Sequence, residues 1–320
     1  MLVLDIANGE VRVAKYSSHL TNMHSPQTQS EQTLQSNPSF EKLLNHLKQS
    51  HGFSFREYKL SSLMRRIQLR MEQVGISTYS DYTTYLQANP DEFESLFNTI
   101  EINVTDFFRD SSAWEYLVAE VIPWIQDQKR ADEPIRLWSA GCASGEEVYS
   151  LAITLAETLG IEQYQKRVRI FASDVDVEAL EEARQGRYPA SRMAHVPETL
   201  IERYFELDGS HYRVRAELRK PLLFFRHNLL EDPPMSNIDL LVCRNALIYF
   251  NCVGQTKALV RFYFSLKSTG VLFLGHSETL PQQHRLFKPL SVKHHMFSKA
   301  DKSSLTPSLL VQALRRSLPV

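Results

Sequence analysis

Cysteine is scarce in this chain of 320 residues, which contains only Cys142, Cys243 and Cys252. Three scattered cysteines cannot form a disulfide framework, and none of them has a metal-ligand spacing with the histidines. We therefore expect free thiols, a reducing cytoplasmic environment and no bound metal ion.

The chain also lacks an excess of charge of either sign and any long apolar run. The 36 Lys and Arg residues nearly balance the 37 Asp and Glu residues, so the net charge favours neither nucleic acid nor an anionic membrane as a partner. No stretch approaches the ~18 apolar residues of a membrane span, and the first 13 residues lack a basic leader. We expect a protein that is neither exported nor inserted into a membrane, with a monomer as the default state.

The pattern along the chain predicts several regions of different kinds. Residues 17–39 are rich in Ser, Gln, Thr and Asn, which is typical of a flexible segment, and residues 1–39 are interpreted as an N-terminal extension. Apolar residues then recur at spacings of three and four, which predicts a helical domain over 40–127. This periodicity is seen at Leu60, Met64, Ile67, Met71 and Val74. Residues 301–320 are interpreted as a C-terminal tail with one weak amphipathic helix.

Residues 128–300 show short apolar runs that alternate with amphipathic helical segments. Such alternation predicts an α/β domain with a mostly parallel, doubly wound sheet. The segment 187–220 is longer than a normal crossover and contains a hairpin signal at Asp208-Gly209, which indicates a small inserted β-subdomain. The expected strands cover residues 135–140, 168–172, 222–225, 238–243, 271–274 and 291–297.

The turn after the first expected strand has the sequence SAGCASGEE at 139–147. Its small residues allow a ligand to approach the backbone before a helix begins. Glu146 and Glu147 in the first helical turn suit a ligand with an amine and a sulfonium better than a pyrophosphate, and no strict G-x-G-x-x-G is present. Taken alone, the turn fits equally well a tight strand-to-helix connection with an acidic cap.

Polar residues follow the other expected strands, at the edge where open α/β sheets bind their ligands. Asp174 is placed to accept the hydroxyl groups of a ribose, whereas Asp176 is predicted to cap the next helix. The third strand ends in His227-Asn228-Leu229 and the fourth in Cys243-Arg244-Asn245. The sequence DPPM at 232–235 is similar to a box found in DNA amino-methyltransferases, but it precedes the fourth strand and lacks the aromatic residue that stacks on a flipped base, so we interpret it as a loop.

Three motifs in order, NVTDFFRD at 103–110, WSAGCASGEE at 138–147 and CRNALIYF at 243–250, resemble the CheR family of chemoreceptor glutamate O-methyltransferases. The resemblance runs from about residue 40 to 300. It implies an all-α N-terminal domain, a Rossmann-like methyltransferase domain with an inserted β-subdomain, and S-adenosylmethionine as the cofactor, with S-adenosylhomocysteine as the product. Val148 stands where the family commonly has proline.

The resemblance also implies roles for individual residues. Asn103, Thr105 and Arg109 would reach the cofactor from the segment between the domains, Glu146 would bind the methionine amino group, and Asp174 the ribose. Asn228 and Leu229 would border the adenine, and Arg244, Asn245 and Tyr249 would line the side of methyl transfer. The substrate would be glutamate carboxylates on the cytoplasmic helices of methyl-accepting chemotaxis receptors.

A glutamate carboxylate is already ionised at neutral pH, so no general base is expected. We expect Arg109 to orient the carboxylate and Tyr249 to donate a hydrogen bond beside the transferred methyl group; packing for Tyr249, and an ion pair with Asp106 or Asp110 for Arg109, are the alternatives. On the predicted helix at 59–74, a stripe of Lys59, Ser62, Arg66 and Arg70 would attract a glutamate-rich receptor helix, unless it is an ordinary solvated face.

Three other functions stay open at this level. One is a methyltransferase of a different acceptor. The second is a cofactor-binding adaptor of a sensory complex that has lost turnover. A dinucleotide oxidoreductase is disfavoured by the absent glycine fingerprint and by the acidic helix start.

Overall fold

The computed structural model describes residues 37–301 apart from 102, 104, 279 and 281–285, together with the backbone of two N-terminal strands. These strands, β1 (Leu4–Ala7) and β2 (Glu10–Val13), pair in an antiparallel manner. Most of the predicted N-terminal extension and nearly all of the predicted tail lie outside the described residues.

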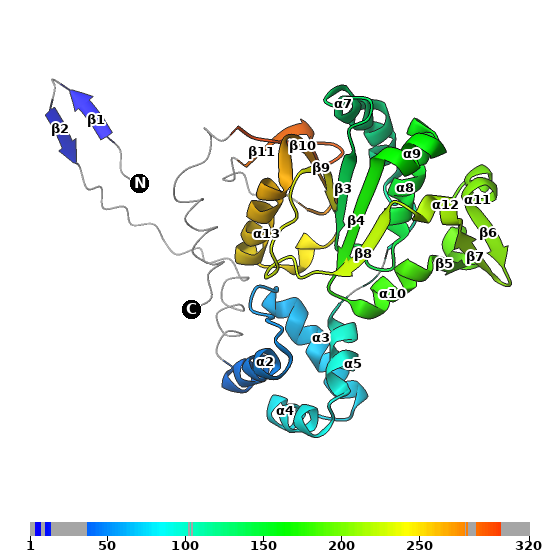
Figure 1. Ribbon diagram of the computed structural model, residues 1–320. Coiled ribbons are helices and arrows are strands. Elements are labelled where there is room, and N and C mark those ends of the chain that lie inside the picture. The colour runs from blue at the N-terminus through cyan, green and yellow to red at the C-terminus, as the bar shows by residue number, and fades with distance from the viewer. Residues whose placement is uncertain are drawn as a thin grey trace.

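The first described unit is helical, as predicted, and sits below the sheet domain in Figure 1. Asn37 begins it by accepting hydrogen bonds from the backbone N–H groups of Ser39 and Phe40, and Gly52 ends the first helix in a left-handed conformation. Apolar residues of all four helices, among them Leu43, Ile67 and Leu96, form one buried core. The helices are α2 (Pro38–His51), α3 (Leu60–Gln73), α4 (Tyr79–Ala88) and α5 (Glu92–Ile100).

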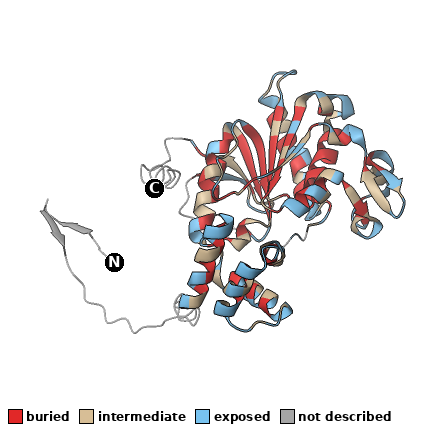
Figure 2. Ribbon diagram, turned by 60° about the horizontal axis from the view of Figure 1, so that its bottom comes forward, coloured by how far each residue is buried: buried red, intermediate tan, exposed pale blue. Residues whose placement is uncertain are grey.

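The second unit is built on a seven-stranded sheet with the order β11-β12-β10-β9-β3-β4-β8. The five strands from β10 to β8 are parallel, and β12 and β11 add an antiparallel edge, so the predicted mostly parallel sheet is confirmed. Figure 2 shows that its central strands are buried on both faces. The parallel strands are β3 (Ile135–Ala140), β4 (Val168–Asp174), β8 (Leu222–Arg226), β9 (Ile238–Cys243) and β10 (Leu266–Leu274).

Helices cover both faces of this sheet, which explains why its central strands read as continuous apolar runs. One face packs against α6 (Ser111–Tyr116), the π-helical turn η1 (Leu117–Val121), α7 (Ile122–Asp127), α8 (Glu146–Leu159), α9 (Ile161–Arg167) and α10 (Val177–Gln185). The opposite face packs against α13 (Cys252–Ser265).

The predicted β-insertion forms a small three-stranded sheet with the order β5-β7-β6. The hairpin expected at Asp208-Gly209 is confirmed, because β6 pairs in an antiparallel manner with β7 across this turn. The insertion comprises β5 (Arg187–Pro189), the 3-10 turn η2 (Ala190–Met193), α11 (Glu198–Tyr204), β6 (Phe205–Asp208), β7 (His211–Val214) and α12 (Ala216–Arg219).

The strand predicted at 291–297 is wrong. Two antiparallel strands, β11 (Phe287–Ser291) and β12 (Met296–Lys299), flank this segment, and the residues between them form a turn in which His295 has a φ of 53°. The predicted segment therefore spans the turn of a hairpin: its first residue ends β11 and its last two residues begin β12, which also pairs with β10.

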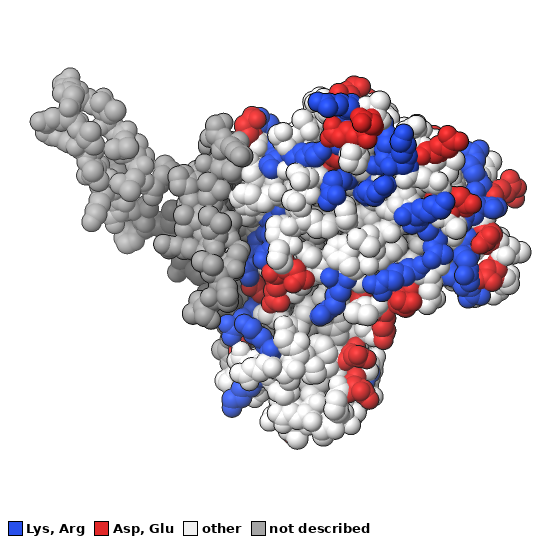
Figure 3. Space-filling model, viewed as in Figure 1, with Lys and Arg blue, Asp and Glu red and all other residues white. Residues whose placement is uncertain are grey.

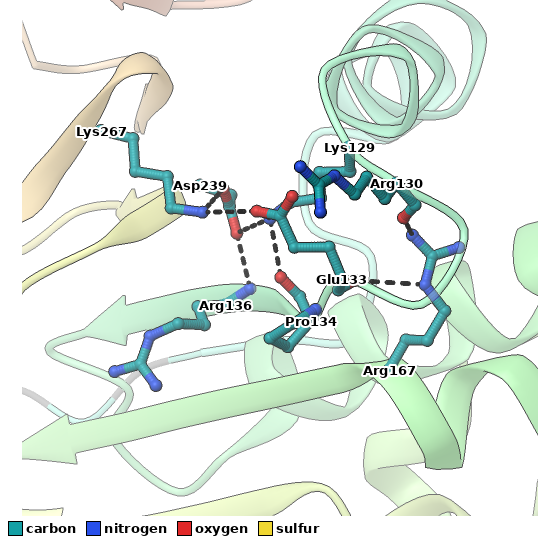
Figure 4. A network of polar contacts seen from close by, with 8 residues as sticks. All are labelled: Lys129, Arg130, Glu133, Pro134, Arg136, Arg167, Asp239 and Lys267. Carbon is teal, nitrogen blue, oxygen red and sulfur yellow. Dashed lines mark hydrogen bonds and ion pairs between the residues drawn. The ribbon is translucent and has the colours of Figure 1, made fainter.

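A network of ion pairs and hydrogen bonds connects the amino ends of β3, β9 and β10 (Figure 4). The buried Asp239 of β9 accepts hydrogen bonds from the backbone N–H of Arg136 at 2.8 Å and forms ion pairs with Lys129 at 3.0 Å and Lys267 at 3.2 Å. Glu133 pairs with the same two lysines at 3.1 Å. The two carboxylates and the two lysines compensate one another's charge, so we interpret this network as structural.

Candidate functional site

A hollow lies at the carboxyl ends of β3, β4, β8 and β9, where the helical unit meets the sheet, which is the expected position for a ligand in this fold. It has two lobes that share Gly141, Ala143, Asn245 and Tyr249. The first lobe is also lined by Thr105, Asp106, Arg109, Cys142, Glu147, Arg244 and Ile248. The second is also lined by Tyr58, Glu101, Asn103, Asp174, Val175, His227, Asn228, Leu229, Ala246 and Phe250.

The turn after β3 forms the floor of both lobes. Gly141 has a φ of 77°, and a Cβ atom at this position would lie 2.9 Å from the Cβ atom of Ala246. The backbone N–H of Gly141 donates to the carbonyl oxygen of Ser173 at 2.8 Å, which fixes the turn against β4. Position 141 therefore requires glycine, because any other residue would strain the backbone and bring its Cβ atom too close to Ala246.

Asp174, at the end of β4, contributes a buried carboxylate to the second lobe. Its two oxygens accept hydrogen bonds from the backbone N–H groups of Ala143 at 2.8 Å and Asp176 at 3.1 Å. Burial raises the pKa of Asp174, and these two N–H groups oppose that shift. Each oxygen retains acceptor capacity for a hydroxyl group, as the ribose prediction requires. Asp176 caps α10 as predicted, and it also accepts a hydrogen bond from Asn103 at 2.6 Å.

The two glutamates at the start of α8 have different surroundings. Glu147 lines the first lobe, accepts a hydrogen bond from Ser139 Oγ at 2.9 Å and lies 3.6 Å from a guanidinium nitrogen of Arg244. Glu146 lines neither lobe; it is fully buried and accepts hydrogen bonds from Ser144 at 2.7 Å and Arg192 of η2 at 2.7 Å. The hollow thus brings Glu147, and not the predicted Glu146, next to the other site residues.

Arg244 joins the sheet edge to the segment that carries Arg109. Its guanidinium donates to the carbonyl oxygen of Arg109 at 2.9 Å and to the carboxylate of Asp110 at 2.6 Å, and it stacks over the rings of Trp114 and Phe273. Trp114 also donates its indole N–H to the Arg109 carbonyl at 2.9 Å. Arg109 is thereby held at the first lobe, together with the predicted Thr105.

The loop after β9 positions Asn245 and Tyr249. The buried carboxylate of Glu278 accepts hydrogen bonds from the backbone N–H groups of Asn245, Leu247 and Gly275 at 3.0, 2.7 and 2.6 Å. Asn245 itself has a φ of 60°, a strained conformation that these bonds maintain. Sequence reasoning did not identify Glu278, because its partner loop lies about thirty residues earlier in the chain.

Two residues of the helical unit, Tyr58 and Glu101, reach the second lobe and were not predicted. The hydroxyl of Tyr58 donates to the carboxylate of Glu101 at 2.9 Å. Burial, followed by the charge of Asp174, raises the pKa of Glu101 to about 7, and the hydrogen bond from Tyr58 opposes this shift. Tyr58 also packs edge-on against Phe250, so the two units close the hollow together.

A neighbouring hollow on α3 shares Tyr58 and Tyr249 with this site and is lined by Lys59, Arg65 and Arg66. The predicted substrate residue Arg66 therefore lies beside Tyr249. Arg70 lies in a different environment, because its guanidinium forms an ion pair with the buried Glu92 at 2.7 Å. Figure 3 shows Lys and Arg side chains on several parts of the sheet unit.

The residues present suit a ligand with hydroxyl groups, a cationic end and a carboxylate. Asp174 and Glu147 offer acceptors and negative charge, Arg109 and Arg244 offer positive charge, and Asn228 and Leu229 border the second lobe. In the described ranges, no group of His, Cys, Asp and Glu side chains is arranged to hold a metal ion. None of the helices in these ranges is both long and apolar enough to span a membrane.

Comparison with known families gives two matches. The all-alpha domain of CheR methyltransferases matches residues 38–100, and the SAM binding domain of CheR methyltransferases matches residues 103–296. The predicted cofactor is confirmed: the sheet unit is a domain that binds S-adenosylmethionine.

Individual relatives are similar over most of the chain. A chemotaxis protein methyltransferase of Listeria innocua is 35% identical over 73% of this chain and 87% of its own length, and chemotaxis protein methyltransferase 2 of Pseudomonas aeruginosa is 34% identical over 82% and 92%. An uncharacterized 104.1 kDa protein of Rhodobacter capsulatus is 37% identical over 80% of this chain, which spans only 27% of that relative.

Proposed function

Because the chain belongs to the CheR methyltransferase family, we propose that it transfers the methyl group of S-adenosylmethionine to glutamate side chains of methyl-accepting chemotaxis receptors. The products would be glutamate methyl esters and S-adenosylhomocysteine. The observation that carries the proposal is that Arg109 and Tyr249 line one lobe together with Glu147, and that Tyr249 also lines the basic hollow on α3. We place the enzyme in the cytoplasm as a monomer.

The hollow offers a partner for each part of the cofactor. Asp174 would accept the ribose hydroxyls, and Asn228 and Leu229 would border the adenine. Asn103 and Thr105 would contact the cofactor from the segment between the domains, and Arg244 and Asn245 would line the side of methyl transfer. For the methionine amino group we prefer Glu147 to the predicted Glu146, because only Glu147 lines the hollow.

The main task of the protein in this reaction is to orient the two reactants. S-adenosylmethionine supplies an activated methyl group, and a glutamate carboxylate is already ionised at neutral pH. The chain then has to align the carboxylate oxygen with that methyl group and exclude water, and such orientation lowers a barrier by up to roughly 7–11 kcal/mol. Arg109 would hold the carboxylate and Tyr249 would donate a hydrogen bond beside the methyl group.

The acceptor would approach over α3. Lys59, Arg65 and Arg66 surround the hollow next to Tyr249, so positive charge is concentrated where a glutamate-rich helix would enter. Electrostatic attraction of this kind weakens with salt, since exposed charges are screened beyond about 10 Å at 0.1 M ionic strength.

The test is transfer of labelled methyl from S-adenosylmethionine to the cytoplasmic fragment of a chemoreceptor from the same cell. We expect label on the receptor that is released by mild base, as a glutamyl methyl ester requires. Stable label would indicate methylation of another group. Tight cofactor binding without transfer would favour a cofactor-binding adaptor or a different acceptor.

A further inference from the structure

Glu101 lies where a helix of the N-terminal unit ends at the cofactor hollow. It is the residue after α5, and its backbone N–H donates to the carbonyl oxygen of Phe97 at 2.9 Å. Its side chain lines the second lobe with Asp174, and the hydroxyl of Tyr58 donates to it at 2.9 Å. The carboxylate is thus held by one hydrogen bond and directed at the lobe that contains the proposed ribose site.

The groups around Glu101 make its negative charge unfavourable. Asp174 and Asp176 approach from the end of β4, and Tyr58 from the segment before α3. Tyr249 lines the same lobe; burial, followed by the charge of Glu101, raises the pKa of Tyr249, and the positive charges of Arg66 and Arg109 oppose this shift. His227 lines the lobe from the end of β8. Within the described part of the chain, Glu101 makes no ion pair, so burial and its acidic neighbours keep the pKa at about 7.

We infer that Glu101 is a second acidic ligand for the ribose of the cofactor, supplied by the helical domain, and that it binds the cofactor in its ionised form. The inference rests on the placement of the ribose beside Asp174 proposed above. A ribose brings two hydroxyl donors, and Glu101 lines the same lobe as Asp174 with one hydrogen bond, from Tyr58, to its carboxylate. Hydroxyl donors placed between the two carboxylates relieve the repulsion between them and stabilise the ionised Glu101.

The direction of the pH dependence follows from this arrangement. Hydroxyl donors favour the ionised form, so binding lowers the pKa of Glu101 from its value of about 7 in the free protein. The affinity for S-adenosylhomocysteine therefore increases as the pH rises from 6 to 8, and binding releases a proton. If the pKa falls by about one unit, the dissociation constant decreases roughly three- to tenfold over this range.

Isothermal titration calorimetry with S-adenosylhomocysteine on the full chain measures this change, and buffers of different ionisation enthalpy report the released proton. Glu101→Gln should bind more weakly at pH 8 and lose the pH dependence. The matched control is Glu94→Gln, which changes an exposed carboxylate of α5, the helix that Glu101 follows, and should keep the wild-type profile. A flat wild-type profile, or an unchanged slope in Glu101→Gln, would overturn the inference, because the pH dependence would then come from a different group.

Two further measurements separate ligand binding from a structural effect. Tyr58→Phe removes the hydrogen bond that lowers the pKa of Glu101, so the midpoint of the profile should move to higher pH. Asp174→Asn tests the underlying placement, because it should weaken binding at every pH. Adenosine should lose more affinity than 2′,3′-dideoxyadenosine in Glu101→Gln; equal losses would show that Glu101 does not contact the ribose hydroxyls.

Discussion

At the start of α8, neighbouring glutamates are separated by about 100° around the helix axis, and this step gives them different partners. Glu146 faces η2 and is bound by Arg192, whereas Glu147 faces the hollow at the carboxyl ends of the strands. Burial raises the pKa of both carboxylates, and the positive charges of Arg192 and Arg244 oppose the shift at Glu146 and Glu147 respectively. Glu146 is thus bound by protein side chains and does not line the hollow, whereas Glu147 does.

Separate substitutions of these glutamates test the assignment. Glu147→Gln should raise the dissociation constant of S-adenosylhomocysteine roughly tenfold or more, because a charged hydrogen bond to the ligand is lost. Glu146→Gln should mainly lower the free energy of unfolding, by about 1–3 kcal/mol, since it weakens a buried charged contact with Arg192. Calorimetry and urea unfolding measure both effects; a larger loss of affinity in Glu146→Gln would restore the original prediction.

The hydroxyl group of Tyr249 is proposed to donate a hydrogen bond beside the transferred methyl group, and its removal tests this role. Tyr249→Phe should lower kcat for receptor methylation roughly 10- to 100-fold while cofactor affinity stays within a factor of two, because only the proposed hydrogen bond beside the methyl group is removed. Tyr85→Phe, on the distant α4, is the control for loss of a hydroxyl group. Unchanged turnover in Tyr249→Phe would leave a packing role for this ring.

Among the elements, α3 shows how residues one turn apart come to differ in role. Arg66 lines the basic hollow beside Tyr249, but Arg70 forms an ion pair with Glu92, whose side chain is only 4% exposed. Tyr82 donates to the same carboxylate at 2.7 Å. Burial alone would raise the pKa of Glu92, yet the hydrogen bonds from Arg70 and Tyr82 lower it.

Charge reversal on α3 should therefore have two outcomes. Arg66→Glu should reduce receptor methylation several-fold at low salt and leave stability almost unchanged. Arg70→Glu should lower the free energy of unfolding by about 3 kcal/mol or more, since it leaves a buried carboxylate without its partner. Methyl-transfer assays at 20 and 200 mM salt measure the loss of receptor methylation, and urea unfolding measures the loss of stability. Normal low-salt methylation by Arg66→Glu would contradict the docking surface.

The ion pair between Arg70 and Glu92 predicts how the free energy of unfolding depends on pH. Because the pKa of Glu92 is lower in the folded chain, its contribution is present above the unfolded value near 4.5 and is lost as the pH falls through the folded value. Arg70→Met should reduce this acid-side loss, which urea unfolding between pH 3 and 6 would detect. An identical pH profile in the wild type and the variant would exclude the pair as its source.

At the scale of the whole molecule, the cofactor hollow is closed by both domains. The backbone N–H of Lys59 donates to the carbonyl oxygen of Tyr249 at 2.8 Å, that of Asn251 to the carbonyl oxygen of Glu57 at 2.8 Å, and Lys257 pairs with Glu57. These contacts connect the segment before α3 to the loop that carries Tyr249. A ligand in the hollow should therefore stabilise the two domains together.

Thermal unfolding measures this coupling. S-adenosylhomocysteine at 100 times its dissociation constant should stabilise the chain by about 2.7 kcal/mol and raise the melting temperature by several degrees. The same concentration of NAD should have no effect, because the turn lacks the glycine fingerprint and two carboxylates begin α8. Stabilisation by NAD alone would contradict the cofactor assignment.

The sequence by itself determined the fold class, the cofactor and the positions of most strands along the chain, because local patterns and motifs carry this information. The apolar runs of β3 and β9 and the hairpin turn at Asp208-Gly209 are local signals, and the capping by Asp176 follows from its position before a helix. Three consecutive motifs then specified the family.

Only the tertiary structure decided which side chains face the hollow. The phase of α8 separates Glu147 from Glu146, and the docking of the helical domain brings Glu101 and Tyr58 to Asp174. The structure likewise places a turn between β11 and β12, and pairs β12 with β10, where the sequence predicted one strand. Contacts between residues tens of positions apart leave no periodic signal in the sequence, since each depends on how packed elements are oriented in space.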